Sequence, residues 1–197
     1  MFKTNSSTSR ERILEGIVTT INEDDTTNIS PMGPLVDAAM SRLTLRPFQS
    51  STTYRNLKHH GEGVLHITDD VELLARAAVG VAAPPVRDAS AVRWRILVDA
   101  CRWYAFRVVE LDDREERTTI HCEVVDCGRQ RDFFGFNRAK HAVVEAAILA
   151  TRIGILPDDK IRRDMESLEI LVEKTGGDEE HRAFAFLTDY VSERLGS

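Results

Sequence analysis

The chain has 197 residues, of which 42% are hydrophobic, and this is enough to form a core without disulfide bonds or metal ions. Charged residues make up 29% and the formal net charge is -6, which excludes a disordered chain, a collagen and a small disulfide-linked scaffold. Because the cysteine count is odd and there is no secretory signal, basic stretch or bilayer-length apolar run, we expect a soluble cytoplasmic protein that binds neither nucleic acid nor membrane.

Short β-strands are predicted for the first part of the chain. β-Branched residues predict strands over 13–21 and 27–30, which an acidic turn joins into a hairpin. The sequence Pro-Met-Gly-Pro at 31–34 contains two residues that lack a backbone N–H, so it predicts a break in strand pairing. Residues 35–45 then predict one or two further strands.

A helix and a second group of strands follow. Hydroxyl-bearing residues at 50–53 predict the start of a helix that runs to about His60 and ends at Gly61. Beyond it the pattern predicts, in chain order, a strand over 64–68, a short helix over 71–79, a proline-rich loop over 82–90, and strands over 92–98, 101–111 and 117–125.

The pattern becomes helical after Gly128. Asn137 is expected to cap a helix over 138–153, which is apolar nearly all round and should therefore be buried on most sides. Two more helices are predicted over 158–174 and 178–195. Strands followed by helices indicate an α+β fold, and at least six short strands indicate a small antiparallel barrel.

Motifs of several enzyme classes are missing from the sequence. It contains no glycine-rich nucleotide-binding motif, no nucleophile elbow and no His-Glu-x-x-His motif. Cys122 and Cys127 are five residues apart, which does not match zinc spacing, and the adjacent His59 and His60 point to different faces of a helix. We therefore assign no metal site and no catalytic residue from the sequence.

Residues 28–56 have the composition of a phosphate-binding region. They include Ser30, Arg46 and the hydroxyl cluster at the predicted helix start, where unpaired N–H groups carry a partial positive charge. Arg46 adds a fixed cation. Serine and threonine also cap helices that bind no ligand, so a purely structural role of the cluster is the alternative.

Residues 129–141 combine aromatic and charged side chains before the predicted apolar helix. Phe133, Phe134 and Phe136 lie among arginines, a lysine and a histidine. Such a cluster suits a flat anionic ligand or a subunit interface, and it equally suits a hydrophobic staple with a charged collar at a helix start. The sequence leaves these interpretations open.

Two sets of segments resemble known families. The segments IVTTINEDDTTNIS, PMGP and LRPFQSSTTYRNLKHHGEGVLHITDD resemble the FMN-binding split barrels of the flavin-reductase-like group. The segments DACRWYAF, RDFFGFNRAKHAVVEAAILATRIGILP and VEKTGG are similar to a family of unknown function within that group. The likeness extends from about Ile13 to Val191.

The resemblance implies an α+β fold with a mainly antiparallel, six-stranded split β-barrel and a helical C-terminal part. It implies an FMN-binding barrel domain over 12–135 and a helical part over 136–197, packed on the barrel or at a dimer interface. A homodimer is expected, with FMN in a groove near the interface.

Carried over position by position, the resemblance also implies three groups of cofactor-binding residues. The isoalloxazine ring would lie along Ser30, Pro31, Met32 and Gly33. The ribityl chain and phosphate would be held by a second group, namely Arg46, Phe48, Ser51, Thr52, Thr53 and Asn56. A third group would reach the site from the C-terminal half, namely Asn137, Arg138 and His141.

Three functions follow from the resemblance. The first is an FMN-dependent oxidoreductase or flavin reductase that uses a nicotinamide donor. The second is a flavin-binding carrier or sensor without turnover. The third is a split barrel that holds a deazaflavin, a haem or a pterin. Flavin chemistry needs no side-chain nucleophile, because the cofactor carries the electrons.

Overall fold

The computed structural model describes residues 11–88 and 95–196. Ten strands and five helices are formed within these ranges. In chain order they are β1 Arg12–Ile13, β2 Gly16–Ile21, β3 Thr27–Met32, β4 Leu35–Val36, β5 Arg42–Leu45, α1 Thr52–His60, β6 Glu62–Ile67, α2 Val71–Ala78, β7 Val86–Asp88, β8 Arg95–Leu97, β9 Arg102–Asp112, β10 Thr119–Arg129, α3 Arg138–Ala150, α4 Asp158–Thr175 and α5 Asp178–Leu195.

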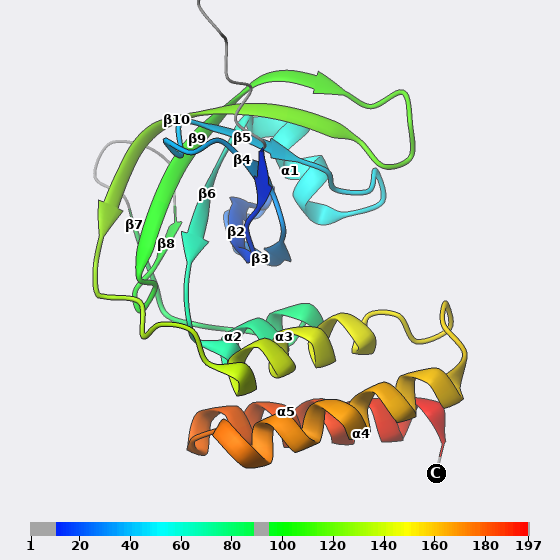
Figure 1. Cartoon of the computed structure of the whole chain (residues 1–197). Coiled ribbons are helices and arrows are strands. Elements are labelled where there is room, and N and C mark those ends of the chain that lie inside the picture. The colour runs from blue at the N-terminus through cyan, green and yellow to red at the C-terminus, as the bar shows by residue number, and fades with distance from the viewer. Residues whose placement is uncertain (1–10, 89–94, 197) are drawn as a thin grey trace, which may run out of the picture.

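Eight strands form one antiparallel sheet in the order β1-β4-β5-β10-β9-β6-β2-β3. The sheet curls into a half-barrel, and α1 lies against its open side (Figure 1). Residues from the concave face, among them Leu43, Leu65 and Phe106, form the barrel core together with Tyr54 and Leu57 of α1. α1 begins as predicted, with Ser51 as its N-cap, and ends at Gly61, whose φ of 68° is the left-handed conformation that favours glycine.

The expectation of six strands was wrong, because the main sheet has eight. β1 and β4 contain two residues each, and no alternating pattern can be read from so short a segment. The expected break at 31–34 was also placed too early, since Pro31 and Met32 pair with Ile17 and Gly16. β3 is the last strand of the sheet, and an edge strand tolerates the missing N–H of a proline.

The segment before β9 also differs from its prediction. β7 pairs with β8 in a separate two-stranded sheet, whereas the sequence predicted a loop over the residues of β7. The predicted strand over 92–98 is described only from residue 95, and its first residues lie outside the described part.

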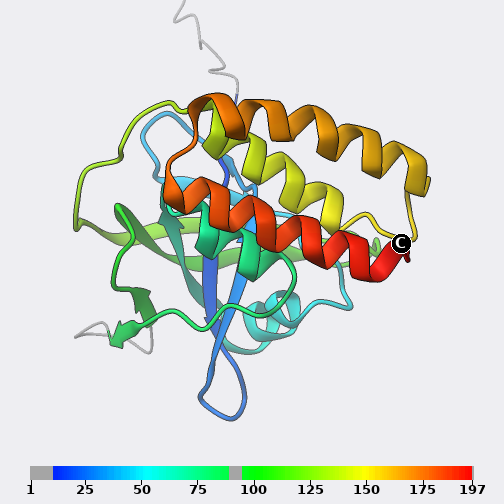
Figure 2. The same cartoon turned by 90° about the horizontal axis from the view of Figure 1, so that it is seen from below.

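The helices form two layers below the barrel. α2 and α3 lie between the sheet and the pair α4 and α5, and the view from below shows the outer pair running side by side (Figure 1, Figure 2). α3 is buried through its small residues, namely Ala139, Ala142, Ala146, Ala147 and Ala150, as the sequence predicted. It ends at Ala150 and not at Ile153, because Thr151 begins a turn that leads to Gly154.

None of the described helices has the length and apolar character needed to cross a bilayer. The three cysteines are free. Cys101 and Cys122 are buried, and Cys127 is exposed.

Candidate functional site

An apolar pocket of about 320 Å³ lies where the end of β3 meets α2 and α3. The end of β3 supplies one wall, and small or branched side chains of the two helices supply the other. The residues that line it are Glu15, Ser30, Pro31, Met32, Gly33, Leu74, Ala77, Ala78, Val144, Ala147, Ile148 and Thr151. All four residues that were expected along a flavin ring, Ser30 to Gly33, therefore lie together at one cavity.

The sequence of the two helices explains why space is left here. α2 presents Ala77 and Ala78 and α3 presents Ala147 to the pocket, and these short side chains leave room beside β3. On β3, side chains alternate between the two faces of the sheet. Ile29 accordingly packs against the helices, whereas Met32 packs against the barrel core. The pocket thus forms at the seam between the two hydrophobic cores.

Gly33 lies just after β3, where the side chains of Ile13 and Glu15 pack over it. A Cβ atom at this position would lie 2.9 Å from Cγ2 of Ile13 and 3.1 Å from Oε1 of Glu15. The carboxyl group of Glu15 thus lies beside Gly33 in the lining of the pocket. Partial burial raises the pKa of Glu15 above its usual value, and the nearby charge of Glu145 on α3 raises this pKa further.

The start of α1 offers donors for an anion. Ser51 Oγ accepts a hydrogen bond from Tyr54 N at 3.1 Å, so Ser51 is the member of the predicted cluster at 50–53 that caps the helix. The N–H groups of Thr52 and Thr53 lie in the first turn, where a helix provides no backbone acceptor. A polar hollow of about 430 Å³ adjoins the helix start, and Thr52, Arg55, Asn56 and His59 line it on the helix side. The β2–β3 turn lines the other side with Asn22 and with two carboxylates, Glu23 and Asp24.

Arg55 is a candidate phosphate ligand that the sequence analysis missed. Its guanidinium group turns back to the start of the helix and donates to Ser50 O at 2.8 Å and to Thr52 Oγ1 at 3.0 Å. A cation at the positive end of a helix is unfavourable on its own, and a bound anion would compensate it. The sequence did contain a signal for this role, because Arg55 follows the N-cap Ser51 by four residues. One helical turn places such a residue above the start of the helix.

Thr53 and Asn56 are buried and connect α1 to the β2–β3 hairpin. Asn28 Nδ2 on β3 donates to Thr53 Oγ1 at 3.0 Å. Asn56 Nδ2 donates to Thr20 Oγ1 at 2.9 Å and to Asn22 Oδ1 at 2.8 Å. These bonds fix the start of α1 beside β3, the strand that also leads to the apolar pocket.

Arg46 and Phe48 lie on the exposed loop before α1. The guanidinium of Arg117 lies 5.7 Å from the centre of the Phe48 ring, and Phe48 and Arg117 form a β-bridge. Neither Arg46 nor Phe48 lines the apolar pocket or the polar hollow.

The three expected residues of the C-terminal half lie at the start of α3. Asn137 caps the helix through bonds from Ala139 N at 2.8 Å and Lys140 N at 3.1 Å. Arg138 and His141 are exposed. His141 precedes Val144 of the apolar pocket by three residues, about one helical turn, whereas Asn137 lines a different cavity.

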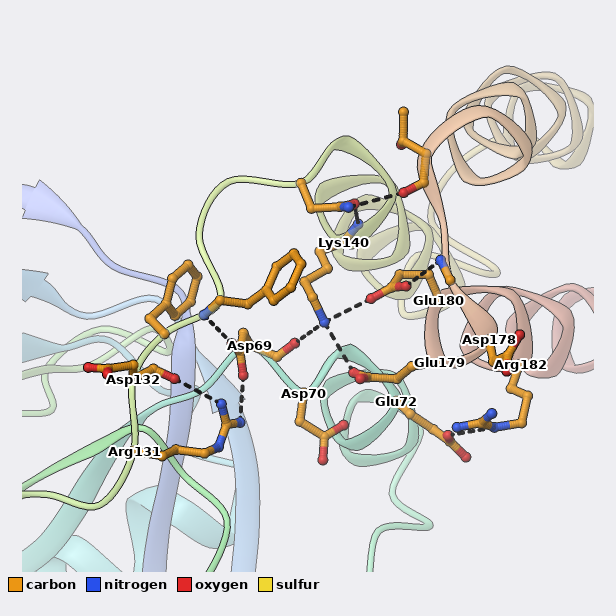
Figure 3. A pocket seen from close by; sticks show the side chains of 15 residues that line it. Asp69, Asp70, Glu72, Arg131, Asp132, Lys140, Asp178, Glu179, Glu180 and Arg182 are labelled. Atoms are coloured by element: carbon orange, nitrogen blue, oxygen red, sulfur yellow. Dashed lines mark hydrogen bonds and ion pairs between the residues drawn. The ribbon is translucent and has the colours of Figure 1, made fainter.

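That second cavity is a polar basin of about 910 Å³ between the starts of α2, α3 and α5 (Figure 3). Arg131 reaches Asp69 at 2.5 Å, and Lys140 reaches Glu180 at 2.8 Å and Asp69 O at 2.7 Å. Phe134 N donates to Asp69 Oδ2 at 2.6 Å. Figure 3 shows these groups pointing toward one another between the helices.

The charges of the polar basin disfavour an anionic ligand. Its lining contains seven carboxylates and three cations. The pKa of Asp69 is lowered to about 2, since the bonds from Arg131 and Phe134 N outweigh the effect of burial. The seven carboxylates are Asp69, Asp70, Glu72, Asp132, Asp178, Glu179 and Glu180. Because the cations already pair with these acids, the basin is best described as a network that joins helix starts.

The sequence matches models of one protein family over most of its length. Residues 14–131 match the N-terminal domain of the family described as Protein of unknown function (DUF447), and residues 137–189 match the second model of that family. No curated protein matches the sequence significantly.

Solved structures share the fold. An FMN-bound protein of the same family from Methanosarcina mazei has a TM-score of 0.79 and 23% identity, over 92% of this chain and 96% of that one. A flavoredoxin from Methanosarcina acetivorans has a TM-score of 0.51 and 13% identity, over 66% and 75%. An FMN-binding protein from Thermus thermophilus has a TM-score of 0.50 and 11% identity, over 66% and 76%.

Proposed function

Because the chain belongs to the DUF447 family, and a structure of that family contains FMN, we propose that this protein is an FMN-binding flavoprotein. The observation that supports it best is the arrangement of two complementary sites along β3. At one end of the strand lies the apolar pocket, and near the other lies the anion-accepting start of α1.

The dimensions suit a ring joined to a phosphate by a short chain. Asn28, which bonds to the start of α1, and Met32, which lines the apolar pocket, lie roughly 13 Å apart along the strand. A flat heterocycle requires an apolar slot with a few polar groups at its edge, and the pocket provides this through Ser30, Glu15 and Thr151.

The residues have distinct parts in this proposal. Ser30, Pro31, Met32 and Gly33 contact the ring, and Thr52 and Arg55 hold the phosphate. Ser51, Thr53 and Asn56 keep the helix start in place through their hydrogen bonds. Bound FMN supplies the electron-carrying group, and the chain provides its orientation and surroundings. A dianionic phosphate suits the helix start and not the carboxylate-rich basin.

We further propose that the protein is an oxidoreductase that takes electrons from a nicotinamide donor and acts as a homodimer. β3 has no neighbouring strand on one side in the described sheet, and its end lines the pocket, so a second copy that packs against this edge would add to the groove. In this proposal residues 12–135 form the cofactor-binding domain and residues 136–197 form its helical support.

Titration with FMN and with riboflavin tests the proposal, because riboflavin has the same ring and lacks the phosphate. We expect binding of both, with FMN bound more tightly. Thr52→Glu places a carboxylate at the helix start and should weaken FMN binding while leaving riboflavin binding nearly unchanged. Absence of flavin binding contradicts the proposal. NADH or NADPH oxidation by the FMN-loaded protein then distinguishes an oxidoreductase from a flavin carrier.

A further inference from the structure

Glu15 is the charged residue among the twelve that line the apolar pocket. It lies in the link between β1 and β2, and Oε1 approaches the backbone of Gly33 so closely that a Cβ there would be 3.1 Å away. The residue keeps an exposed part in the free chain, although its surroundings already shield the carboxyl group partly from water. A ring seated against Ser30, Met32 and Gly33 would cover it.

The surroundings of Glu15 shift its titration toward the neutral form. Partial burial raises its pKa, and the charge of Glu145 on α3 adds repulsion between like charges. The side chains that α2 presents to the pocket, Leu74, Ala77 and Ala78, are uncharged. Neither β3 nor the two helices contributes a cation to the pocket lining that would hold Glu15 as a carboxylate.

We infer that Glu15 is a ligand-binding residue whose carboxyl group enters the flavin complex in its protonated form, so that binding of the ring takes up one proton. The inference rests on the proposed function, since it assumes that the ring occupies the apolar pocket. It adds a proton-linked contact to that function and identifies the residue responsible.

Two physical effects support this assignment. Covering a carboxyl group with an apolar ring removes water from it, which penalises its charged form more than its neutral form. The neutral form can also bond to the ring, because a protonated carboxyl group donates a hydrogen bond. A flavin ring carries carbonyl oxygens and unprotonated nitrogens at its edge that accept such a bond. A carboxylate at the same place offers only acceptors.

The dissociation constant for FMN, measured between pH 5 and pH 8, tests the inference. For the wild-type protein we expect weaker FMN binding as the pH rises. In the pH range where binding takes up one proton, the dissociation constant should rise by up to about tenfold per pH unit. The phosphate of FMN titrates near pH 6 and contributes its own pH dependence. Glu15→Gln retains the shape and hydrogen-bonding capacity without titration, so the difference between the two proteins isolates Glu15.

Two further variants complete the test. Glu145→Gln removes the neighbouring charge and should shift the pH profile to lower pH, whereas Glu193→Gln on the exposed face of α5 should leave it unchanged. Equal pH profiles of the unchanged protein and Glu15→Gln, with FMN bound by both, overturn the inference and leave the proposed function intact. Failure of every variant to bind FMN or riboflavin at any pH overturns both.

Discussion

Lys140 of α3 and Glu180 of α5 form an ion pair at 2.8 Å in which both side chains are buried. The ammonium group also donates to Asp69 O at 2.7 Å, just before α2. Three helices from different parts of the chain thus meet at one cation. Although burial alone would lower the pKa of Lys140, its bond to Glu180 and the charges of Glu179 and Glu180 raise it, so the lysine is protonated in the folded protein.

Lys140→Met should destabilise the fold. The substitution leaves the carboxylate of Glu180 buried without its partner, and loss of one member of a buried pair typically costs about 3–5 kcal/mol. Urea unfolding measures this loss. Lys160→Met is the matched control, since Lys160 pairs with Asp164 on the exposed side of α4 and should contribute less than about 1 kcal/mol. Equal effects of the two substitutions would contradict the importance of the buried pair.

Arg55→Ala should weaken FMN binding more than Arg46→Ala does. Arg55 is already directed to the start of α1 by its bonds to Ser50 and Thr52, whereas Arg46 lies on the exposed loop before the helix. Loss of a charge-assisted bond to phosphate corresponds to about 1.5–3 kcal/mol, or roughly tenfold to more than a hundredfold in affinity. Fluorescence titration of the two variants gives the order. A larger loss for Arg46→Ala would assign the phosphate contact to Arg46.

The substitutions Ala147→Phe and Ala146→Phe distinguish the contribution of the pocket to flavin binding from the contribution of the helical core to stability. Ala147 lines the apolar pocket, so a phenyl ring there should block flavin binding. Ala146 is fully buried among the helices, where overpacking typically costs about 1–3 kcal/mol of stability. Flavin titration and urea unfolding should therefore give opposite orders of severity for the two neighbouring substitutions. Unchanged flavin binding in Ala147→Phe would show that the ring does not occupy this pocket.

His66 makes the stability of the fold depend on pH. Its ring is fully buried, Nδ1–H donates to Ile17 O at 3.2 Å, and Nε2 accepts from Leu97 N at 3.1 Å. Both nitrogens are therefore used by the neutral ring, and burial lowers the pKa of His66 to about 4.

The direction of the effect follows from proton binding. The unfolded chain protonates His66 below a pH of about 6.5, and the folded chain does so only near its lowered pKa. Stability should fall as the pH decreases from about 6.5 to about 4, by about 3 kcal/mol in total. Urea unfolding at several pH values measures this slope. His66→Gln should unfold more easily at pH 7 and should lose the part of the slope that is due to His66.

Local signals in the sequence were sufficient for much of the fold. The capping by Ser51 and Asn137 and the glycine stop at Gly61 were predicted because each depends on neighbouring residues alone. β1 and β4 were not, since two-residue strands exist only through their pairing with distant segments.

The same distinction applies to the candidate site. Ser30 to Gly33 form one continuous segment, and the structure places them at a single pocket. Glu15 and Arg55 were missed because their positions depend on contacts that sequence spacing does not show, one beside Gly33 and the other beside Thr52. The helical wall of the pocket was missed for the same reason, since α2 and α3 are far apart in the chain.

The position of Pro31 on the outermost strand has a consequence for self-association. An uncovered strand edge is a template on which further chains can add strands, and this leads to fibrils and aggregates. A proline in such a strand interrupts the row of donors that an added strand would need. The residue beside the candidate flavin site therefore also protects the open end of the sheet against uncontrolled polymerisation.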